Sequence, residues 1–481
     1  MLFNSYAFVF AFLPATLIAF HVARTWLGQR AAMVTLLLAS LTFYGLWNLG
    51  ALALLLASIG GNYLAGRLLE RRRSKALLTL FVVLNLCVLG YYKYANFFLE
   101  TADGLGANFT FVRVILPLGI SFFTFEQITF LVDVYRGRTA PGKLPAYGLF
   151  VAFFPHLIAG PIVQHRKLAA QFNRPPTPGD AWNNLGLGLS IFAVGLAKKV
   201  LIADSFEPTA SGLFNAAAHG VHPAADASWL GAFAYAFQIY FDFSGYSDMA
   251  IGLARMFGLA LPVNFRSPYR AGSIIDFWRR WHISLSTFLR DYVYIPLGGN
   301  RHGEGRRYAN LMATMLLGGL WHGAAWTFVV WGGLHGLYLV IAQLVRQRLP
   351  GPHGKAYRAL AWIATFFAVT LAWVFFRADS FTTAWTILTG MAGGYGLTSG
   401  TGAGTVALAA AGFLLVWLAP ETADLFRLND DGEPSPADPD RPERAWRRWA
   451  QSVPWAVATG LLLLVAILNM TRITEFIYYQ F

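Results

Sequence analysis

The sequence predicts an all-helical protein that crosses a membrane many times. Of its 481 residues, 56% are hydrophobic and 13% are charged, whereas a soluble globular protein carries about 25% charged residues. The mean hydropathy of +0.48 agrees with this. Apolar runs of about 17–25 residues, each long enough to cross ~30 Å of hydrocarbon, recur along the whole chain. We therefore expect one membrane-embedded domain over residues 1–481, although length alone would suggest about three domains.

Ten apolar runs are predicted to be single crossings. In chain order they are 6–23, 31–47, 49–69, 76–99, 112–134, 184–203, 229–254, 359–377, 403–420 and 453–470. The first run has no basic start and no small-residue cleavage site, so we expect it to be kept rather than removed as a signal peptide. The single cysteine, Cys87, lies within a run and is predicted to be a buried structural thiol.

Three further apolar segments do not fit a simple crossing. Pro145–Gln164 has basic residues on both sides and contains Pro155 and Pro161, which favours a broken helix that enters the membrane and returns. Ile274–Leu297 carries too many charges to face lipid, so we expect a re-entrant or interfacial helix buried against protein.

The third unusual segment, Tyr308–Val345, is 38 residues long and contains no Lys, Arg, Asp or Glu. Basic residues stand at both of its ends, so it is predicted to form a hairpin of two helices. The glycines of Gly318–Gly319 and His322–Gly323 mark the region of the bend.

Positive charge reports the topology. The net charge of +13 lies in short clusters between the apolar runs, at Glu70–Lys75, Arg301–Arg307 and Arg441–Arg448. This is the positive-inside pattern rather than one exposed basic face, so we expect a lipid bilayer and no nucleic acid as partner. Both termini then lie outside, with a cytoplasmic loop at about 421–450 and an extracytoplasmic tail at 471–481. Lys198–Lys199 does not fit: the pair either snorkels or lines a polar cavity.

His322 is the strongest candidate for chemistry. It lies within the stretch that has no charged residue, where a polar group costs free energy unless it has a partner or a task. Histidine is also the side chain best suited to move a proton near neutral pH. The alternative is a structural histidine bonded to a backbone carbonyl, but the surrounding glycines favour function.

A second histidine lies 40 residues earlier. His282 follows Arg279 and Arg280 and is flanked by Trp278 and Trp281. One interpretation is the polar wall of a membrane cavity, in which the arginines bind an anionic acyl donor. The alternative is an interfacial helix whose Trp and Arg side chains anchor at headgroup depth.

Three carboxylates also fall within predicted crossings: Asp242, Asp248 and Glu126. Such groups are either functional or paired, and a structural salt bridge to one of the nearby arginines is equally compatible with the sequence. The remaining histidines lack the spacing of a zinc site, so no metal is expected. They are His156, His165, His302 and His335.

Several longer motifs together resemble a known family. They read "PLGISFFTFEQITFLVDVYRG", "FFPHLIAGPIVQ", "YFDFSGYSDMAIGLARMFG", "NFRSPYRAGSIIDFWRRWHISLSTFLRDYVYIPLGGNR" and "GGLWHGAAWTFVVWGGLHG". In their order, their spacing and their residues, these motifs are similar to those of the membrane-bound O-acyltransferase superfamily. Within it they most resemble the bacterial alginate O-acetyltransferase branch, which is related to the D-alanyl transferase of teichoic acid modification. The resemblance runs from about Met1 to Phe481.

The resemblance implies a ring of about 10–12 transmembrane helices, with re-entrant helices around a central tunnel. It makes His322 the catalytic histidine and His282 the second signature polar residue. It also places a carboxy-terminal motif at Phe476, Tyr478 and Phe481, where Tyr478 is a possible acyl relay. The residues we expect to bind the donor or line the tunnel are Arg279, Arg280, Trp281, Trp321, Asp242 and Asp248.

The predicted function is transfer of an acetyl group across the bacterial inner membrane, with both termini periplasmic. The donor is expected to be cytosolic acetyl-CoA, with no bound cofactor. His322 removes a proton from the attacking hydroxyl, and His282 orients it or stabilises the developing oxyanion. The hydroxyl belongs to Tyr478 or to a serine of a periplasmic SGNH-type acetyltransferase. The final acceptor is an exopolysaccharide such as alginate.

Two other classes stay open from the sequence. One is a proton-coupled transporter or flippase that uses the intramembrane carboxylates as a relay, although no internal repeat is visible. The other is a non-catalytic scaffold of a polysaccharide export complex.

Overall fold

A computed structural model describes residues 1–106, 113–172, 179–349, 351, 354–435, 449–470 and 476–477. Throughout this part of the chain the regular structure is helical, and the single β-bridge, between Leu428 and Pro434, belongs to no strand. Six of the described helices are long and apolar enough to cross a membrane. The predicted all-helical membrane fold is therefore confirmed, while the number of crossings stays a prediction.

The chain divides into two compact units. Unit 1 comprises Met1–Ala197, Tyr246–Val263 and Phe426–Gln480, and unit 2 comprises Lys198–Gly245 and Asn264–Leu425. The predicted single domain is not tested by this division.

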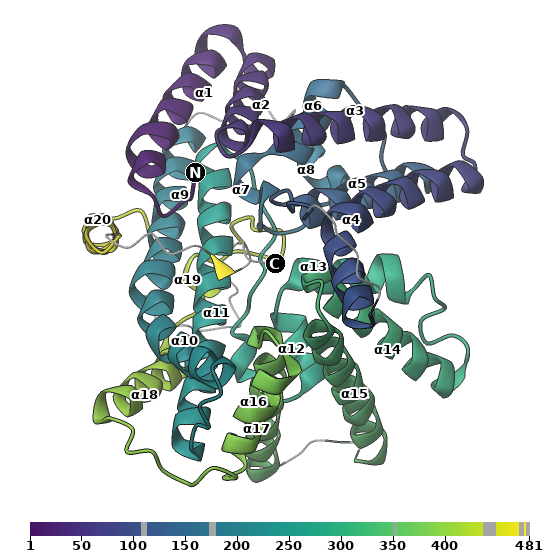
Figure 1. The fold of residues 1–481 in the computed structure, drawn as a ribbon. Coiled ribbons are helices and arrows are strands. Elements are labelled where there is room, and N and C mark those ends of the chain that lie inside the picture. Colours follow the sequence, from purple (N-terminus) through teal and green to yellow (C-terminus); the bar gives the residue numbers. More distant parts are fainter. Residues whose placement is uncertain are drawn as a thin grey trace. The chain divides into compact units, whose positions relative to one another are not determined.

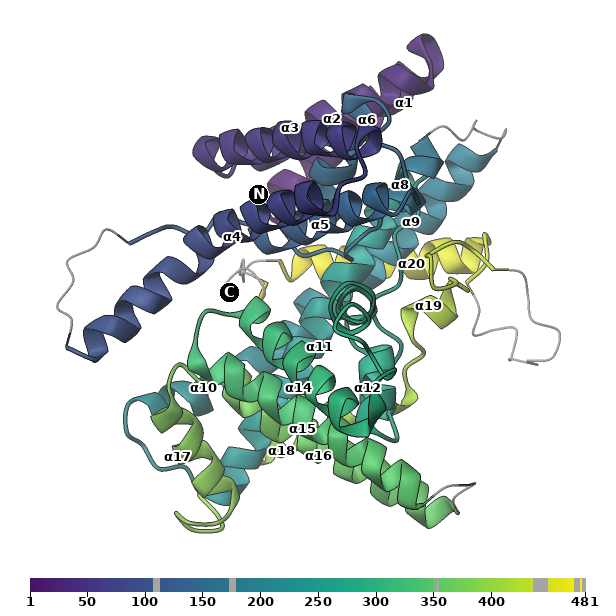
Figure 2. The same cartoon turned by 90° about the vertical axis from the view of Figure 1, so that its right-hand side faces the viewer.

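Unit 1 holds the first nine α-helices and the last one. They are α1 (Leu13–Leu27), α2 (Gln29–Gly45), α3 (Leu49–Arg71), α4 (Lys75–Gly104), α5 (Ile120–Tyr135), α6 (Leu144–Ala152), α7 (Phe154–Leu157), α8 (His165–Phe172), α9 (Asp180–Ala197) and α20 (Val453–Leu468). Helices α1 and α2 lie side by side (Figures 1 and 2), joined through Gly28, whose φ of 88° favours glycine. Asn48 and Ser74 cap α3 and α4 by accepting backbone N–H bonds.

Cys87 shows where one prediction was wrong. It is exposed on α4 rather than buried. Only 6% of the most apolar stretch of α4 is buried within the protein. This helix therefore presents its side chains outward along most of its length. An apolar run alone does not say which of its residues pack against protein, because lipid accepts the same side chains.

The broken character of the first unusual segment is confirmed. Helix α6 ends at Ala152, the four-residue α7 follows, and residues 158–164 are not helical. The neighbouring prediction of a crossing over 112–134 was too long, because α5 begins only at Ile120. Gly119 precedes it with a φ of 75°, and a Cβ at Gly119 would collide with the backbone of Leu157 and Ile158.

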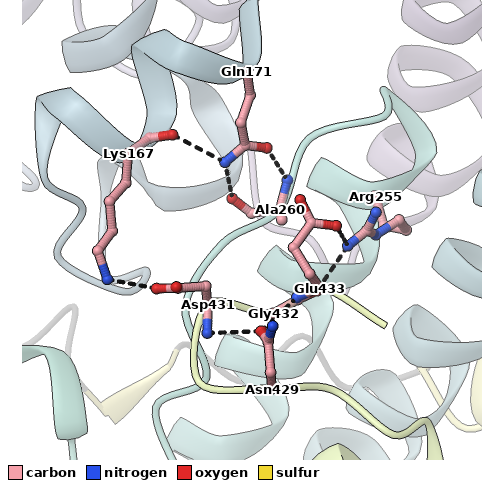
Figure 3. Close-up of polar contacts among 8 residues, drawn as sticks. All are labelled: Lys167, Gln171, Arg255, Ala260, Asn429, Asp431, Gly432 and Glu433. Atoms are coloured by element: carbon pink, nitrogen blue, oxygen red, sulfur yellow. Dashed lines mark hydrogen bonds and ion pairs between the residues drawn. The ribbon is translucent and has the colours of Figure 1, made fainter. Parts of the chain in front are cut away.

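A polar turn at residues 427–435 is fastened to the rest of unit 1 (Figure 3). Asn429 Oδ1 accepts the N–H groups of Asp431 and Glu433, which closes the turn. Arg255 then donates to Gly432 O at 2.7 Å and to Glu433 Oε2 at 3.0 Å, and the Lys167 ammonium lies 2.5 Å from Asp431. The turn thus holds part of the predicted cytoplasmic loop in one conformation.

Unit 2 holds most of the helices between α9 and α20. They are α10 (Asp204–Ala218), α12 (Ile274–Arg280), α13 (Ile283–Phe288), α14 (Gly303–His322), α15 (Trp326–Arg348), α16 (Lys355–Arg377), α17 (Phe381–Met391), α18 (Ala403–Leu418) and α19 (Thr422–Leu425). Helix α11 (Ala225–Met256) begins in unit 2 and ends in unit 1. The short α17 was not predicted.

Asp226 clamps a loop to the start of α11. Its carboxylate accepts the backbone N–H of Ser399 at 2.9 Å and the Thr401 hydroxyl at 2.8 Å. Partial desolvation acts to raise the pKa of Asp226, but these hydrogen bonds and that from Ala227 N–H outweigh it and hold the pKa well below its usual value. The clamp therefore persists in mildly acidic solution.

Candidate active site

The predicted hairpin of two helices is confirmed as α14 and α15, which lie side by side in both views (Figures 1 and 2). The break falls at residues 323–325, directly after His322. A Cβ at Gly323 would collide with the ring of Phe328, so the chain needs glycine there. His322 is thereby the last residue of α14, at the bend.

Glycines bring the two helices of the hairpin into backbone contact. A Cβ at Gly319 would collide with the carbonyl oxygen of Phe328, and a Cβ at Gly332 would collide with that of Met315. Gly319 therefore serves the packing of α14 against α15 rather than the bend itself. Close backbone approach through small residues is typical of helix pairs in membranes.

Aromatic rings surround the His322 imidazole, which is only 3% exposed. The ring centroids of Trp321, Trp331 and Phe376 lie 4.9, 5.0 and 5.3 Å from it, at interplanar angles of 74°, 84° and 69°. Such edge-to-face contacts fix the orientation of the imidazole and exclude bulk water. A base in this setting is held in one geometry, as proton transfer requires.

His282 occupies a strained position between α12 and α13. Its φ of 42° lies in the left-handed region, which is uncommon for a residue with a Cβ. Asn264 holds the turn: its carbonyl accepts Ile283 N–H at 3.0 Å, and its side-chain oxygen accepts Ser284 N–H at 3.1 Å. The same oxygen lies 3.4 Å from His282 Nδ1. Strain of this kind persists where the surroundings enforce it, often at functional sites.

The two predicted catalytic histidines lie close together. The ring centroids of His282 and His322 are 6.5 Å apart, and His282 lies 6.1 Å from Trp321. Both histidines are buried. A separation of this size allows both rings to contact one small reacting group, such as a carbonyl with its attacking hydroxyl.

Trp281 belongs to an aromatic cluster behind these histidines. Its ring lies 5.0 Å from that of Trp373, which in turn lies 5.8 Å from that of Trp331. Trp373 Nε1 donates to the Tyr269 hydroxyl at 3.0 Å, and Tyr269 donates to Ala236 O at 2.7 Å. These bonds satisfy polar groups that burial would otherwise penalise. They also fix the positions of Trp373 and Tyr269 within the cluster.

The two predicted donor-binding arginines lie in different settings. Arg279 is exposed, while the half-buried Arg280 donates through Nε to Asp276 at 2.9 Å. The Asp276 backbone N–H is bound by Ser273, which caps α12. The role of both arginines toward a donor stays a prediction.

Asp242 is paired rather than isolated. Lys199 Nζ lies 2.7 Å from Asp242 and 2.9 Å from Asp204, and both Lys199 and Asp242 are buried. Lys198 lies 3.5 Å from Glu421. The salt-bridge alternative therefore accounts for Asp242, but its partner is Lys199 and not one of the arginines that we expected. The same pairs explain the basic doublet that did not fit the topology, because each ammonium lies near a carboxylate.

The other predicted carboxylates lie in unit 1. Asp248 is buried there. Glu126 Oε1 accepts Val163 N–H at 3.0 Å and lies 3.0 Å from His156 Nδ1. Tyr478 and Phe481 lie outside the described residues, while Phe476 is buried against Tyr246 with ring centroids 4.8 Å apart.

Three residues near His322 were not singled out as site residues: Trp331, His335 and Phe376. A signal was available for two of them, because Trp331 and His335 are four residues apart and so share one face of α15. The sequence contained no such signal for Phe376, because this residue lies in an ordinary apolar run. Within the described residues, no group of three His, Cys, Asp or Glu side chains could hold a metal ion.

Comparison with known proteins defines the class. The family model for the membrane-bound O-acyltransferase family matches residues 72–383, which include both histidines and the hairpin. The site and this match together define a membrane-embedded acyltransferase.

The chain belongs to the membrane-bound O-acyltransferase family. It is 44% identical over 403 residues to the probable alginate O-acetylase AlgI of Azotobacter vinelandii, covering 81% of this chain and 78% of the relative. It is 41% identical over 424 residues to a peptidoglycan O-acetyltransferase of Helicobacter pylori, covering 82% and 80%. A teichoic acid D-alanyltransferase of Streptococcus thermophilus is 28% identical over 290 residues, covering 54% and 68%. The predicted family and enzyme class are confirmed.

Proposed function

We propose that this membrane acyltransferase is an O-acetyltransferase of the bacterial inner membrane. It takes an acetyl group from cytosolic acetyl-CoA and passes it to a periplasmic acceptor, for O-acetylation of an exopolysaccharide such as alginate. The observation that carries the proposal is the buried pair His322 and His282, with ring centroids 6.5 Å apart in an aromatic setting. The alginate O-acetylases among the relatives support the choice of acetyl group and acceptor.

The proposed chemistry is a direct acyl transfer. The acceptor hydroxyl attacks the thioester carbonyl carbon, so that a C–O bond forms while the C–S bond breaks. His322 takes the hydroxyl proton and returns it to the departing thiolate, which leaves as a thiol, and no net proton is released. A general base of this kind supplies about 10²–10⁴-fold in rate, and the fixed geometry of the pocket supplies more.

His282 acts beside this step as a positioning group. Because the side-chain oxygen of Asn264 accepts hydrogen bonds, the His282 Nδ1–H is directed toward it. A neutral His282 then presents Nε2 as an acceptor beside the reacting group. The single proton of the attacking hydroxyl is taken by His322, so His282 positions the nucleophile by contact rather than by accepting that proton.

The hydroxyl itself is proposed to come from Tyr478 or from a serine of a periplasmic SGNH-type partner. A phenol has a pKa of about 10, so its unaided attack at neutral pH is slow and a base within hydrogen-bond reach is required. Both termini are proposed to be periplasmic, which puts the tail at 471–481 on the acceptor side.

The test is acetyl transfer in membranes that contain the protein. Radiolabelled acetyl-CoA is added, and label is followed in the protein, in polysaccharide and in peptidoglycan. Replacing His322 by alanine is expected to abolish transfer to all three. Replacing Tyr478 by phenylalanine keeps the ring and removes only the hydroxyl, so it separates a tyrosine relay from direct transfer to a partner. Undiminished transfer by the His322→Ala protein would contradict the proposal.

A further inference from the structure

Two nitrogen donors lie on one face of α15, close to His322. Trp331 and His335 are four residues apart, and their ring centroids are 4.7 Å apart. Trp331 is 1% exposed and His335 is fully buried. Neither Trp331 Nε1 nor His335 Nε2 has a hydrogen-bond partner among the described residues. Buried polar groups are normally hydrogen-bonded, so two buried donors in one place indicate a binding site for an acceptor atom.

The neighbouring Trp278 determines where His335 carries its proton. Trp278 Nε1 donates to His335 Nδ1 at 3.2 Å. An indole can only donate, so Nδ1 must present its lone pair, and the proton of a neutral His335 is then on Nε2. The His335 nitrogen that has no acceptor among the described residues is therefore an N–H donor, like the indole N–H of Trp331.

This donor pair lies beside the proposed base. The ring of Trp331 is 5.0 Å from that of His322 on one side and 4.7 Å from that of His335 on the other. Through Trp331 the pair is therefore next to His322, and an oxygen atom bound by its N–H groups would keep the carbon that bears it near that histidine. His282 does not supply such a donor when neutral, because its Nδ1–H is directed to Asn264.

We infer that the N–H groups of Trp331 and His335 bind the carbonyl oxygen of the acyl thioester and stabilise the oxyanion that forms on it. The inference rests on the proposed function. When the hydroxyl oxygen adds to the carbonyl carbon, the C=O electron pair moves onto oxygen, and the hydroxyl proton moves to His322. The pair returns to re-form C=O as the C–S bond breaks, and the thiolate takes the proton back. Donors placed for this oxygen act mainly on the transition state.

Steady-state transfer of the acetyl group from acetyl-CoA by the full-length protein in membranes tests the inference. Trp331→Phe keeps an aromatic ring and removes the indole N–H. His335→Met removes the imidazole donor, whereas His335→Gln keeps an amide N–H donor and an acceptor for Trp278. Trp326→Phe is the matched control, because Trp326 is an exposed indole on the same helix.

We expect kcat to fall about 10²-fold in Trp331→Phe and His335→Met, with little change in KM, because one oxyanion donor is worth about 10²–10³ in kcat. His335→Gln should recover most of the loss, and Trp326→Phe should match the wild type. A merely structural role would instead lower the amount of folded protein and leave kcat per folded molecule unchanged. Folded protein is measured by fluorescence-detected size exclusion.

Unchanged kcat in Trp331→Phe would overturn the inference while leaving the proposed function intact, provided that His322→Ala is inactive. If His335→Met does not fold, the kcat values of Trp331→Phe and His335→Gln test the inference instead. A wild-type protein that transfers nothing from acetyl-CoA would contradict the proposed function itself, and the inference with it.

Discussion

Replacing Gly332 by alanine tests the helix packing that holds His322 in place. The added methyl group would meet the carbonyl oxygen of Met315 and lie 3.2 Å from the Cα of Gly319. Both obstacles are backbone, so no side-chain rotation relieves them and α14 and α15 must separate. Gly333 is the matched control, because a methyl group there has only Leu316 Cδ2 within 4 Å, at 3.6 Å, which is ordinary contact.

The two variants share the same gain in helix propensity, about 1 kcal/mol for alanine over glycine, so the difference between them isolates the steric cost. Overpacking of this kind costs about 1–3 kcal/mol. In a unit of this size each kcal/mol shifts the melting temperature by about 2–4 °C. Gly332→Ala should therefore melt about 2–12 °C below Gly333→Ala. It should also lose acetyl transfer, because Trp331 moves away from His322.

The assay is thermal unfolding of the two purified proteins in the same detergent, followed by intrinsic fluorescence, with acetyl transfer measured in parallel. Equal melting temperatures for Gly332→Ala and Gly333→Ala would refute the close packing of the hairpin. Equal stability with activity lost only in Gly332→Ala would also contradict the reasoning, because the steric cost must appear in both measurements.

Three further predictions concern charged groups. Lys199→Met leaves the buried carboxylate of Asp242 without its nearest ammonium, so it should destabilise the protein by about 3–5 kcal/mol, seen as a large drop in melting temperature. Arg255→Met should destabilise more than Lys167→Met, since Arg255 is buried and the Lys167 pair is exposed and worth at most ~1 kcal/mol; equal melting temperatures would contradict this. The pKa of Asp226 is lowered in the folded protein. The stability that its carboxylate contributes is therefore present above the usual carboxyl pKa, and it is lost as the pH falls through the pKa of Asp226 in the folded protein. Hydrogen exchange of the loop at 398–401 should therefore stay slow at pH 5 in the wild type and be fast in Asp226→Asn.

The hairpin shows what the sequence could establish. A stretch without charges, flanked by basic residues and containing paired glycines, predicted two helices with His322 near the bend, and α14 and α15 confirm that arrangement. The bend itself lies at residues 323–325, because Gly323 leaves room for the ring of Phe328, a contact that the sequence does not reveal.

His282 shows what could not be predicted. Its left-handed backbone depends on Asn264, which lies 18 residues earlier and binds the turn through both its main chain and its side chain. The segment Ile274–Leu297 consequently forms short helices broken at Trp281 and His282, so the prediction of one continuous helix, re-entrant or interfacial, was wrong in its continuity. Sequence periodicity reports local preference, whereas such a turn is fixed by a distant partner.

Pairing between distant residues also explains why the sequence could not decide whether Asp242 has a functional or a structural role. Its partner Lys199 belongs to another helix, and the two lie 2.7 Å apart only once the chain has folded. Arg279 and Arg280 looked alike in the sequence, yet one is exposed and the other is paired with Asp276. Tyr478 lies outside the described residues, and its role as an acyl relay stays a prediction.

The central claim is that His322 is the base for acyl transfer. The most direct measurement is single-turnover transfer from radiolabelled acetyl-CoA in membranes that contain equal amounts of folded wild-type or His322→Gln protein. Glutamine keeps the size and hydrogen bonding of the side chain but cannot accept a proton at neutral pH. We predict a rate at least about 10²–10⁴-fold lower, with donor binding retained. A His322→Gln protein that transfers acetyl groups at the wild-type rate would contradict the account.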